Sequence, residues 1–79
     1  MDLTVFIRHF ADQFDDTDIS EISPETVMRD LDEWSSMIAL SLLNMVEKEY
    51  GVRLSFEELR HAITVRNLFD IVEKKQNNG

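Results

Sequence analysis

The sequence contains no cysteine, one proline and two glycines. Without cysteine there is no disulfide framework, no thiolate metal site and no cysteine nucleophile. Few glycines and prolines mean few obligatory turns, which favours long helices. Hydrophobic runs are also short, since none approaches the roughly 20 apolar residues that a membrane-spanning helix needs. The opening MDLTVFIRHFADQF has no basic segment ahead of an apolar one, so no signal peptide is predicted.

These absences indicate a small soluble chain. Its 79 residues suffice for one domain with an economical core. A chain of this size buries only about 60% of the surface that its unfolded form exposes. We therefore expect a single domain over residues 1–79, located in the cytoplasm and without membrane insertion.

Positive charge is scarce and unevenly placed. The chain has 16 acidic and 8 basic residues, a net charge of −8 at pH 7. Ten of the acids fall within residues 1–33, against only Arg8 and Arg29. Such a field repels nucleic acid and anionic lipid and attracts basic protein surfaces. Alternatively, the charge only keeps a small domain soluble. Neither interpretation includes nucleic-acid binding.

Apolar periodicity predicts an all-α fold. Apolar residues recur at helical spacing over residues 3–14, with Asp2 as a suitable N-cap. A long acidic connection follows over residues 15–35, whose scattered apolar residues are expected to lie against the core. Within it, SPET is predicted to form a single turn. The second helix is predicted from Ser36 to Tyr50, with Gly51 as its left-handed C-terminal residue.

Two further starts complete the predicted bundle. SFEE is a capping box, Ser55 with Glu58, and begins a short third helix. Thr64 begins a fourth helix with one apolar face, and the closing KKQNNG is expected to be a frayed tail. The sequence thus predicts a small helical bundle of three main helices plus one short helix, with a long loop between the first and second.

Two adjacent serines, Ser35 and Ser36, stand at the start of the second helix. Serine is among the best N-caps, contributing about 1 kcal/mol, but only one of two neighbours can occupy the cap. The other hydroxyl then points outward at a helix N-terminus, where free N–H groups and a partial positive charge suit a phosphate. Met37 and Leu40 fall among the polar positions of this helix. They are either ordinary exposed side chains or a small docking patch.

No group of residues predicts catalysis or metal binding. His9 and His61 are interpreted as solvated surface histidines. The acidic stretch DDTDISEISPET does not fit a calcium loop beginning at Asp16, because Glu21 stands where glycine is required and Val27 where the last glutamate is required. Gly-rich phosphate loops and catalytic triads are also missing from the sequence. We therefore predict a chain that is not an enzyme and has no metal site.

These residues resemble an acyl carrier protein. The resemblance covers an amphipathic first helix, an acidic loop, SSMIALSLLNMVEKEYGV and LSFEELRHAITVRNLFDIV, which together are nearly the whole chain. In that family the second helix begins with Asp-Ser-Leu, and its serine bears a 4′-phosphopantetheine arm. Aligned back from Tyr50, Ser36 stands at this serine and Met37 at the leucine, whereas Ser35 replaces the aspartate.

The resemblance implies a monomeric carrier domain spanning residues 1–79. A phosphopantetheinyl transferase would supply the base and the metal, and Ser36 would attack the pyrophosphate of coenzyme A. The arm's thiol would hold acyl intermediates as thioesters, sheltered between the helices and presented to acyl-loading and acyl-processing enzymes with basic docking surfaces. Met37 and Leu40 would make the apolar contact, with Glu47 and Glu49 meeting basic residues.

Several positions depart from the family pattern. Ser35 and the preceding LDEW, in place of a Gly-rich approach, predict weaker recognition by a standard transferase. Carriers of fatty acid synthesis commonly have acids early in this helix, where this chain has Ile38, Ser41 and Asn44. A carrier in a dedicated fatty acid, polyketide or related pathway, with its own partners, fits these residues better than the housekeeping carrier of fatty acid synthesis.

Three points stay open from the sequence. Trp34 either packs against the bundle or lies beside the arm and touches partners. The cargo is fatty acyl, polyketide, aminoacyl or D-alanyl. The alternative from another class is an unmodified acidic interaction module in which Ser36 is only a helix cap.

Overall fold

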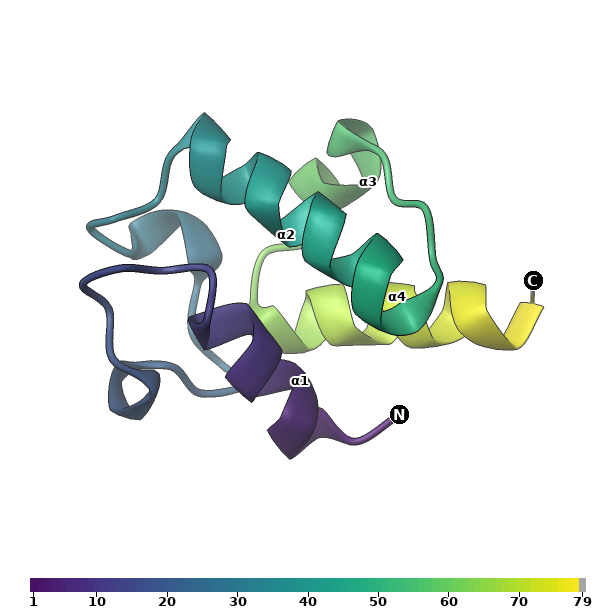
Figure 1. Cartoon of the computed structure of the whole chain (residues 1–79), viewed down its shortest axis with the longest axis horizontal. Helices are drawn as coiled ribbons and strands as arrows, with labels where there is room; N and C mark the ends of the chain where they lie inside the picture. Colours follow the sequence, from purple (N-terminus) through teal and green to yellow (C-terminus); the bar gives the residue numbers. More distant parts are fainter. Residues whose placement is uncertain (79) are drawn as a thin grey trace.

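The fold is a small bundle of α-helices: α1 (Leu3–Ala11), α2 (Ser36–Tyr50), α3 (Phe56–His61) and α4 (Val65–Asn78). It is seen in a computed structural model that describes residues 1–78. Two short 3-10 helices, η1 (Ile19–Glu21) and η2 (Met28–Asp30), lie in the long connection between α1 and α2 (Figure 1). The predicted all-α bundle of three main helices and one short helix is confirmed.

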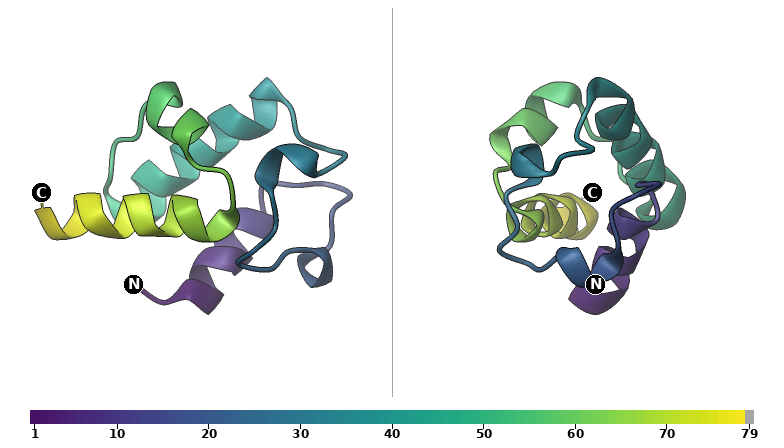
Figure 2. Two further views of the ribbon diagram at one scale, coloured as in Figure 1. Left: turned by 180° about the vertical axis from the view of Figure 1, so that it is seen from behind. Right: turned by 90° about the vertical axis from the view of Figure 1, so that its left-hand side faces the viewer.

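An aromatic cluster joins the helices. α1 contacts α2 and α4, and α3 packs on α2; seen from behind in Figure 2, α3 lies in front of α2 and above α4. Phe6 of α1 is fully buried, with its ring 5.5 Å from that of Phe69 and 5.6 Å from that of Tyr50. Burial of one such side chain contributes about 1.5–3 kcal/mol, so this cluster is the main attachment of α1 to the bundle.

α2 has a capping residue at each end, and it begins and ends at the residues that the sequence predicts. Ser35 is the N-cap, because its hydroxyl oxygen accepts from the amide of Ile38 at 3.2 Å. Gly51 ends the helix at φ 67°, a left-handed conformation that glycine adopts without a Cβ penalty. The buried residues of α2 are Ala39, Leu42, Leu43, Met45 and Val46.

The predicted starts of α3 and α4 are also present. The Ser55 hydroxyl accepts from the Glu58 amide at 3.1 Å, and the Glu58 carboxylate accepts from the Ser55 amide at 3.0 Å. At α4, the amide of Asn67 donates to the Thr64 hydroxyl at 3.1 Å, and the Asn67 side-chain oxygen accepts from the Thr64 amide at 3.0 Å. These reciprocal bonds satisfy first-turn amides that have no partner within their helix.

α1 ends three residues earlier than predicted. After Ala11, the amides of Gln13 and Phe14 bond back to the carbonyls of Phe10 and Ala11 at 3.2 and 3.0 Å, which tightens the last turn. Phe14 is nevertheless buried, with its ring 5.3 Å from that of Phe10. Apolar spacing therefore marks the buried face and not the end of the helix.

The long connection lies against the core, as predicted, except at Ile19. Ile22 and Met28 are buried, whereas Ile19 is 45% exposed on η1. SPET forms the predicted turn, since the Thr26 amide donates to the Ser23 carbonyl at 3.1 Å. The connection therefore buries part of its apolar surface despite having little regular structure.

Part of this connection is bonded to the linker between α3 and α4. Val27 forms an isolated antiparallel bridge with Thr64. The Arg29 guanidinium donates to the carbonyls of Ala62 at 2.9 Å and Arg60 at 3.0 Å. These bonds satisfy carbonyls at the end of α3, which would otherwise lack a partner, and they hold α3 to the loop that leads into α2.

α4 continues through the predicted frayed tail, so that prediction is wrong for residues 74–78. Gly79 lies outside the described residues. The Lys75 ammonium is 2.7 Å from the Glu58 carboxylate, and the Gln76 side chain donates to the Tyr50 carbonyl at 3.2 Å. Contacts with α3 and with the end of α2 thus hold the last turns of the helix.

Candidate functional site

Ser35 and Ser36 have separate positions at the start of α2. Ser35 is the cap, and its hydroxyl oxygen is engaged by the Ile38 amide at 3.2 Å. Ser36 is the first residue of the helix and is exposed. Since the cap is already filled, the Ser36 hydroxyl is available for chemistry without loss of the helix start.

The surroundings of Ser36 fit a phosphodiester. The first amides of a helix have no carbonyl partner within it, and the helix end carries a partial positive charge. The first turn of α2 contains no acidic residue that would oppose a phosphate. An ester on the Ser36 oxygen would therefore place its negative charge where the helix favours an anion.

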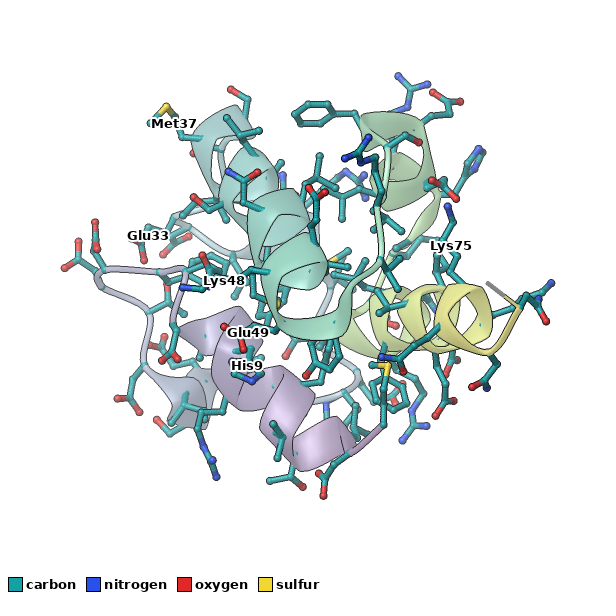
Figure 3. The ribbon with its side chains drawn as sticks, turned by 45° about the vertical axis from the view of Figure 1, so that its right-hand side comes forward. His9, Glu33, Met37, Lys48, Glu49 and Lys75 are labelled. Carbon is teal, nitrogen blue, oxygen red and sulfur yellow. The ribbon has the colours of Figure 1, made fainter. Side chains whose placement is uncertain are left out.

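Two apolar side chains flank Ser36 on the surface. Met37 is 75% exposed and Leu40 is 47% exposed, as their places on the helical wheel predict. In Figure 3, Met37 projects outward from the N-terminal end of α2. These two side chains and the Ser36 hydroxyl form one exposed patch on the first two turns.

Trp34 is half-buried and packs against the edge of the core. It also lines a groove between α2 and α3, together with Ala39 and Phe56. Packing was one of the two roles left open by the sequence, and the structure bears it out.

Glu47 and Glu49 already have partners within the chain. The Glu47 carboxylate lies 3.1 Å from the Arg53 guanidinium, and the two side chains are 51% and 87% exposed. An exposed pair of this kind contributes about 0–1 kcal/mol and is easily exchanged. The Glu49 carboxylate is 4.0 Å from His9. A basic docking residue would therefore have to compete with Arg53 for Glu47.

His9 is not the solvated histidine that the sequence predicts. It is half-buried, its ring lies edge-on to Tyr50 at 5.8 Å, and Figure 3 shows it directed at Glu49. A helical wheel for α1 alone cannot show this, because Tyr50 belongs to the far end of α2. His61 is exposed on α3, as predicted. His9 thus lies at the opposite end of α2 from Ser36.

Glu33 is the residue of the site region that sequence reasoning missed. Its carboxylate accepts from the amides of Asp15 at 2.7 Å and Asp16 at 2.9 Å and from the Thr17 hydroxyl at 2.8 Å. Burial raises the pKa of the Glu33 carboxyl, but these hydrogen bonds lower it by a larger amount. The pKa of Glu33 therefore lies below the ordinary value for glutamate. The carboxylate thereby ties the exit of α1 to the segment just ahead of Ser36.

Other features lie away from this end of the molecule. A groove of about 800 Å³ is lined by Gly51, Arg53, Ile71 and Lys74. It opens beyond the last residue of α2, about 22 Å along the helix from Ser36 at 1.5 Å per residue.

Within residues 1–78, no three His, Asp or Glu side chains are placed to hold a metal ion. In the same residues, no helix has the length and apolarity needed to cross a membrane.

Comparison with known proteins also points to a phosphodiester at the start of α2. Residues 4–72 match the family described as "Phosphopantetheine attachment site". The chain is 34% identical over 61 residues to polyketide-8 synthase acyl carrier protein 2 of Streptomyces avermitilis, and the matched region covers 76% of this chain and 69% of that protein. No solved structure matches the chain. The family match spans α1, α2, α3 and most of α4. The chain belongs to the acyl carrier protein family, whose prosthetic group is 4′-phosphopantetheine.

Proposed function

We propose that Ser36 carries the 4′-phosphopantetheine arm and that the chain presents acyl intermediates to enzymes of a polyketide or related pathway. The observation that carries the proposal is the separation of the two serines. Ser35 caps α2, whereas Ser36 is exposed on its first turn. The pathway is supported by the polyketide synthase carrier to which the chain is similar.

Attachment is a phosphoryl transfer from coenzyme A. The Ser36 oxygen forms a bond to the phosphorus that bears pantetheine, the P–O bond within the pyrophosphate breaks, and adenosine 3′,5′-bisphosphate leaves. The hydroxyl proton passes to a base of the phosphopantetheinyl transferase. First-turn amides of α2 stabilise the negative charge on the ester, by about 0.3–1 kcal/mol for an exposed site. Once bound, the arm supplies the thiol that this cysteine-free chain lacks, and the thiol holds acyl groups as thioesters.

Partner enzymes would dock on the exposed patch around Ser36. Met37 and Leu40 offer apolar contact, and the acidic connection ahead of α2 favours partners with basic surfaces. Trp34, Ser35 and Glu47 border this patch or continue it along α2. In this proposal residues 1–79 act as one monomeric, cytoplasmic carrier domain that supplies no catalytic group of its own.

The test is the intact mass of the purified chain after incubation with coenzyme A and a broad-specificity phosphopantetheinyl transferase. We expect a gain of one phosphopantetheine in the wild type and none in Ser36→Ala. Ser35→Ala is the matched control, because it removes the neighbouring hydroxyl and keeps that of Ser36. We expect it to gain one phosphopantetheine, although it loses the cap of α2.

The same measurement can refute the proposal in two ways. A gain in Ser36→Ala that disappears in Ser35→Ala would assign the arm to Ser35. No gain in the wild type with several transferases would leave the chain as an unmodified interaction module.

A further inference from the structure

The groove of about 800 Å³ beyond the end of α2 has no role in the proposed attachment at Ser36. It opens between the linker that joins α2 to α3, α3 itself and the second half of α4. α4 contributes residues at helical spacing, which therefore share one face of the helix. These residues are Ile71, Lys74, Lys75 and Asn78. Ligand pockets in proteins range from about 300 to 1,000 Å³, so the groove can hold more than a single side chain.

The charged side chains of this groove are mainly cationic. Arg53, Lys74 and Lys75 line it, and Glu58 is the acid among the described lining residues. Three of the eight lysines and arginines of the chain thus gather at one groove, although the net charge of the chain is −8.

Two of the basic side chains are already engaged. The Lys75 ammonium is 2.7 Å from the Glu58 carboxylate, and Figure 3 shows Lys75 between α3 and α4. His61, which also lines the groove, lies 3.6 Å from the Glu57 carboxylate on its own helix. Lys75 and His61 therefore do not add free positive charge to the groove.

Arg53 and Lys74 are the cations that a ligand can reach. The Arg53 guanidinium pairs with Glu47 at 3.1 Å, but it is 87% exposed, and an exposed pair of this kind is easily exchanged. Lys74 is exposed and forms no ion pair within residues 1–78. Arg53 belongs to the linker and Lys74 to α4, so the two cations come from different walls of the groove.

The lining between these walls is partly apolar. Ile71 is half-buried against the core, and Val52 is buried. The exposed part of Ile71 offers contact to an apolar side chain of a ligand. A ligand that combines carboxylates with an apolar side chain therefore matches both the charge and the lining.

A short acidic segment of protein has this chemistry. Nucleic acid and anionic membranes are also negative, but they extend far beyond the groove and would face the acids of the rest of the chain. The net charge of −8 repels such extended polyanions. A short segment can place its carboxylates at the groove alone.

We propose that this groove docks an acidic, partly apolar segment of a partner protein, with carboxylates on Arg53 and Lys74 and an apolar side chain on Ile71. The groove lies about 22 Å along α2 from Ser36, so a partner bound there leaves the serine exposed. The chain is thus held at one end while the other end stays open to enzymes.

The experiment uses the full, unmodified chain labelled with ¹⁵N. The probe is a synthetic octapeptide of glutamate with leucine at its third and sixth positions, and a peptide with glutamine in place of glutamate is its control. We expect saturable shifts of the amide signals of residues 51–53 and 74–76 with the glutamate peptide alone. Binding should weaken strongly between about 0.01 and 0.15 M salt, because exposed charges are screened.

A double variant tests the two cations. Arg53→Gln combined with Lys74→Gln should weaken peptide binding about tenfold. Arg8→Gln combined with Arg66→Gln removes the same charge from exposed positions outside the groove and should change binding less than about twofold. Circular dichroism verifies the fold of both variants.

Several results would overturn the inference. They are the absence of saturable shifts, equal binding of the glutamine peptide, and equal losses in the two double variants, which would indicate a general charge effect. Binding of phosphatidylglycerol vesicles without binding of the peptide would assign the groove to a membrane. Because the shifts are measured on the unmodified chain, failure of the mass gain would overturn the proposed attachment at Ser36 and leave this inference intact.

Discussion

At the scale of single residues, the neighbouring hydroxyls of Ser35 and Ser36 differ in what their substitution removes. Ser35→Ala deletes the cap of α2 and should lower the free energy of unfolding by about 1 kcal/mol. Ser36→Ala removes an exposed hydroxyl outside the cap and should change it by less than about 0.5 kcal/mol. Urea unfolding followed by circular dichroism measures both. A larger loss in Ser36→Ala would mean that Ser36 is the cap.

Glu33 should order the loop ahead of Ser36. Glu33→Gln leaves one oxygen where two accept from the amides of Asp15 and Asp16 and from Thr17. We therefore expect faster hydrogen exchange at the Asp15 and Asp16 amides. Asp32→Asn, at the exposed neighbouring position, is the control. Unchanged exchange in Glu33→Gln would show that the loop is held by other contacts.

The same carboxylate should make the loop sensitive to acid. Because the net pKa of Glu33 in the fold is lowered, the ordering is present above the ordinary glutamate pKa of about 4.3. It is lost as pH falls through the lower folded value. The difference in amide protection between wild type and Glu33→Gln should therefore shrink in that acidic range.

Local chemistry decides which of these residues can be predicted. Helix capping, which depends on three or four neighbouring residues, predicts that one of the two serines is the cap and the other is exposed. The resemblance to the family, and not capping, pointed to Ser36 as the exposed one. Glu33 could not be predicted, because its partners are mainly backbone amides far back in the chain, and a glutamate in an acidic run is typical of a solvated position. The prediction that His9 is a solvated surface histidine was wrong for a related reason, because the helical periodicity of α1 contains no information about Tyr50 on α2.

At the scale of elements, the last turns of α4 depend on contacts with α3. Lys75 donates to Glu58 at 2.7 Å, and this bond, followed by the bond from the Ser55 amide, lowers the pKa of Glu58. Lys75→Met should reduce the helicity of the C-terminal turns and the free energy of unfolding at neutral pH. Lys74→Met, at the exposed neighbouring position, is the control.

This contribution should also depend on pH in a defined direction. A glutamate with a lowered folded pKa contributes stability above its unfolded pKa of about 4.3 and loses it as pH falls through the folded value. The difference in unfolding free energy between wild type and Lys75→Met should thus be largest near neutral pH and should shrink as pH falls through the lowered pKa of Glu58. A difference that stays constant through this acidic range would exclude the carboxylate as the cause.

Helix starts were more predictable than helix ends. An N-cap or a capping box depends only on residues that are close together in the sequence. The helices accordingly begin where the sequence predicts them, as the caps of α2 and α3 show. The ends of α1 and α4 depend on tertiary contacts instead. Phe14 is buried outside the helix, and Gln76 reaches the Tyr50 carbonyl of another element.

At the scale of the whole molecule, apolar exposure and negative charge meet near Ser36. Met37→Glu adds a charge to a side chain that is 75% exposed, so the fold should be unaffected. It should lower kcat/KM of the transferase for this chain about tenfold, equivalent to about 1.4 kcal/mol of lost apolar contact. Ile19→Glu adds the same charge on η1 and should have little effect. Equal losses in both variants would indicate a general charge effect in place of a docking contact.

The assignment of the arm to Ser36 is tested most directly by tandem mass spectrometry of the modified wild-type chain. Fragmentation between the two adjacent serines separates the possible sites without any mutation. We predict that the added mass stays with fragments that begin at Ser36 and is missing from fragments that end at Ser35. Added mass on fragments that end at Ser35 would contradict the account, because the residue that caps α2 would then be the one that carries the arm.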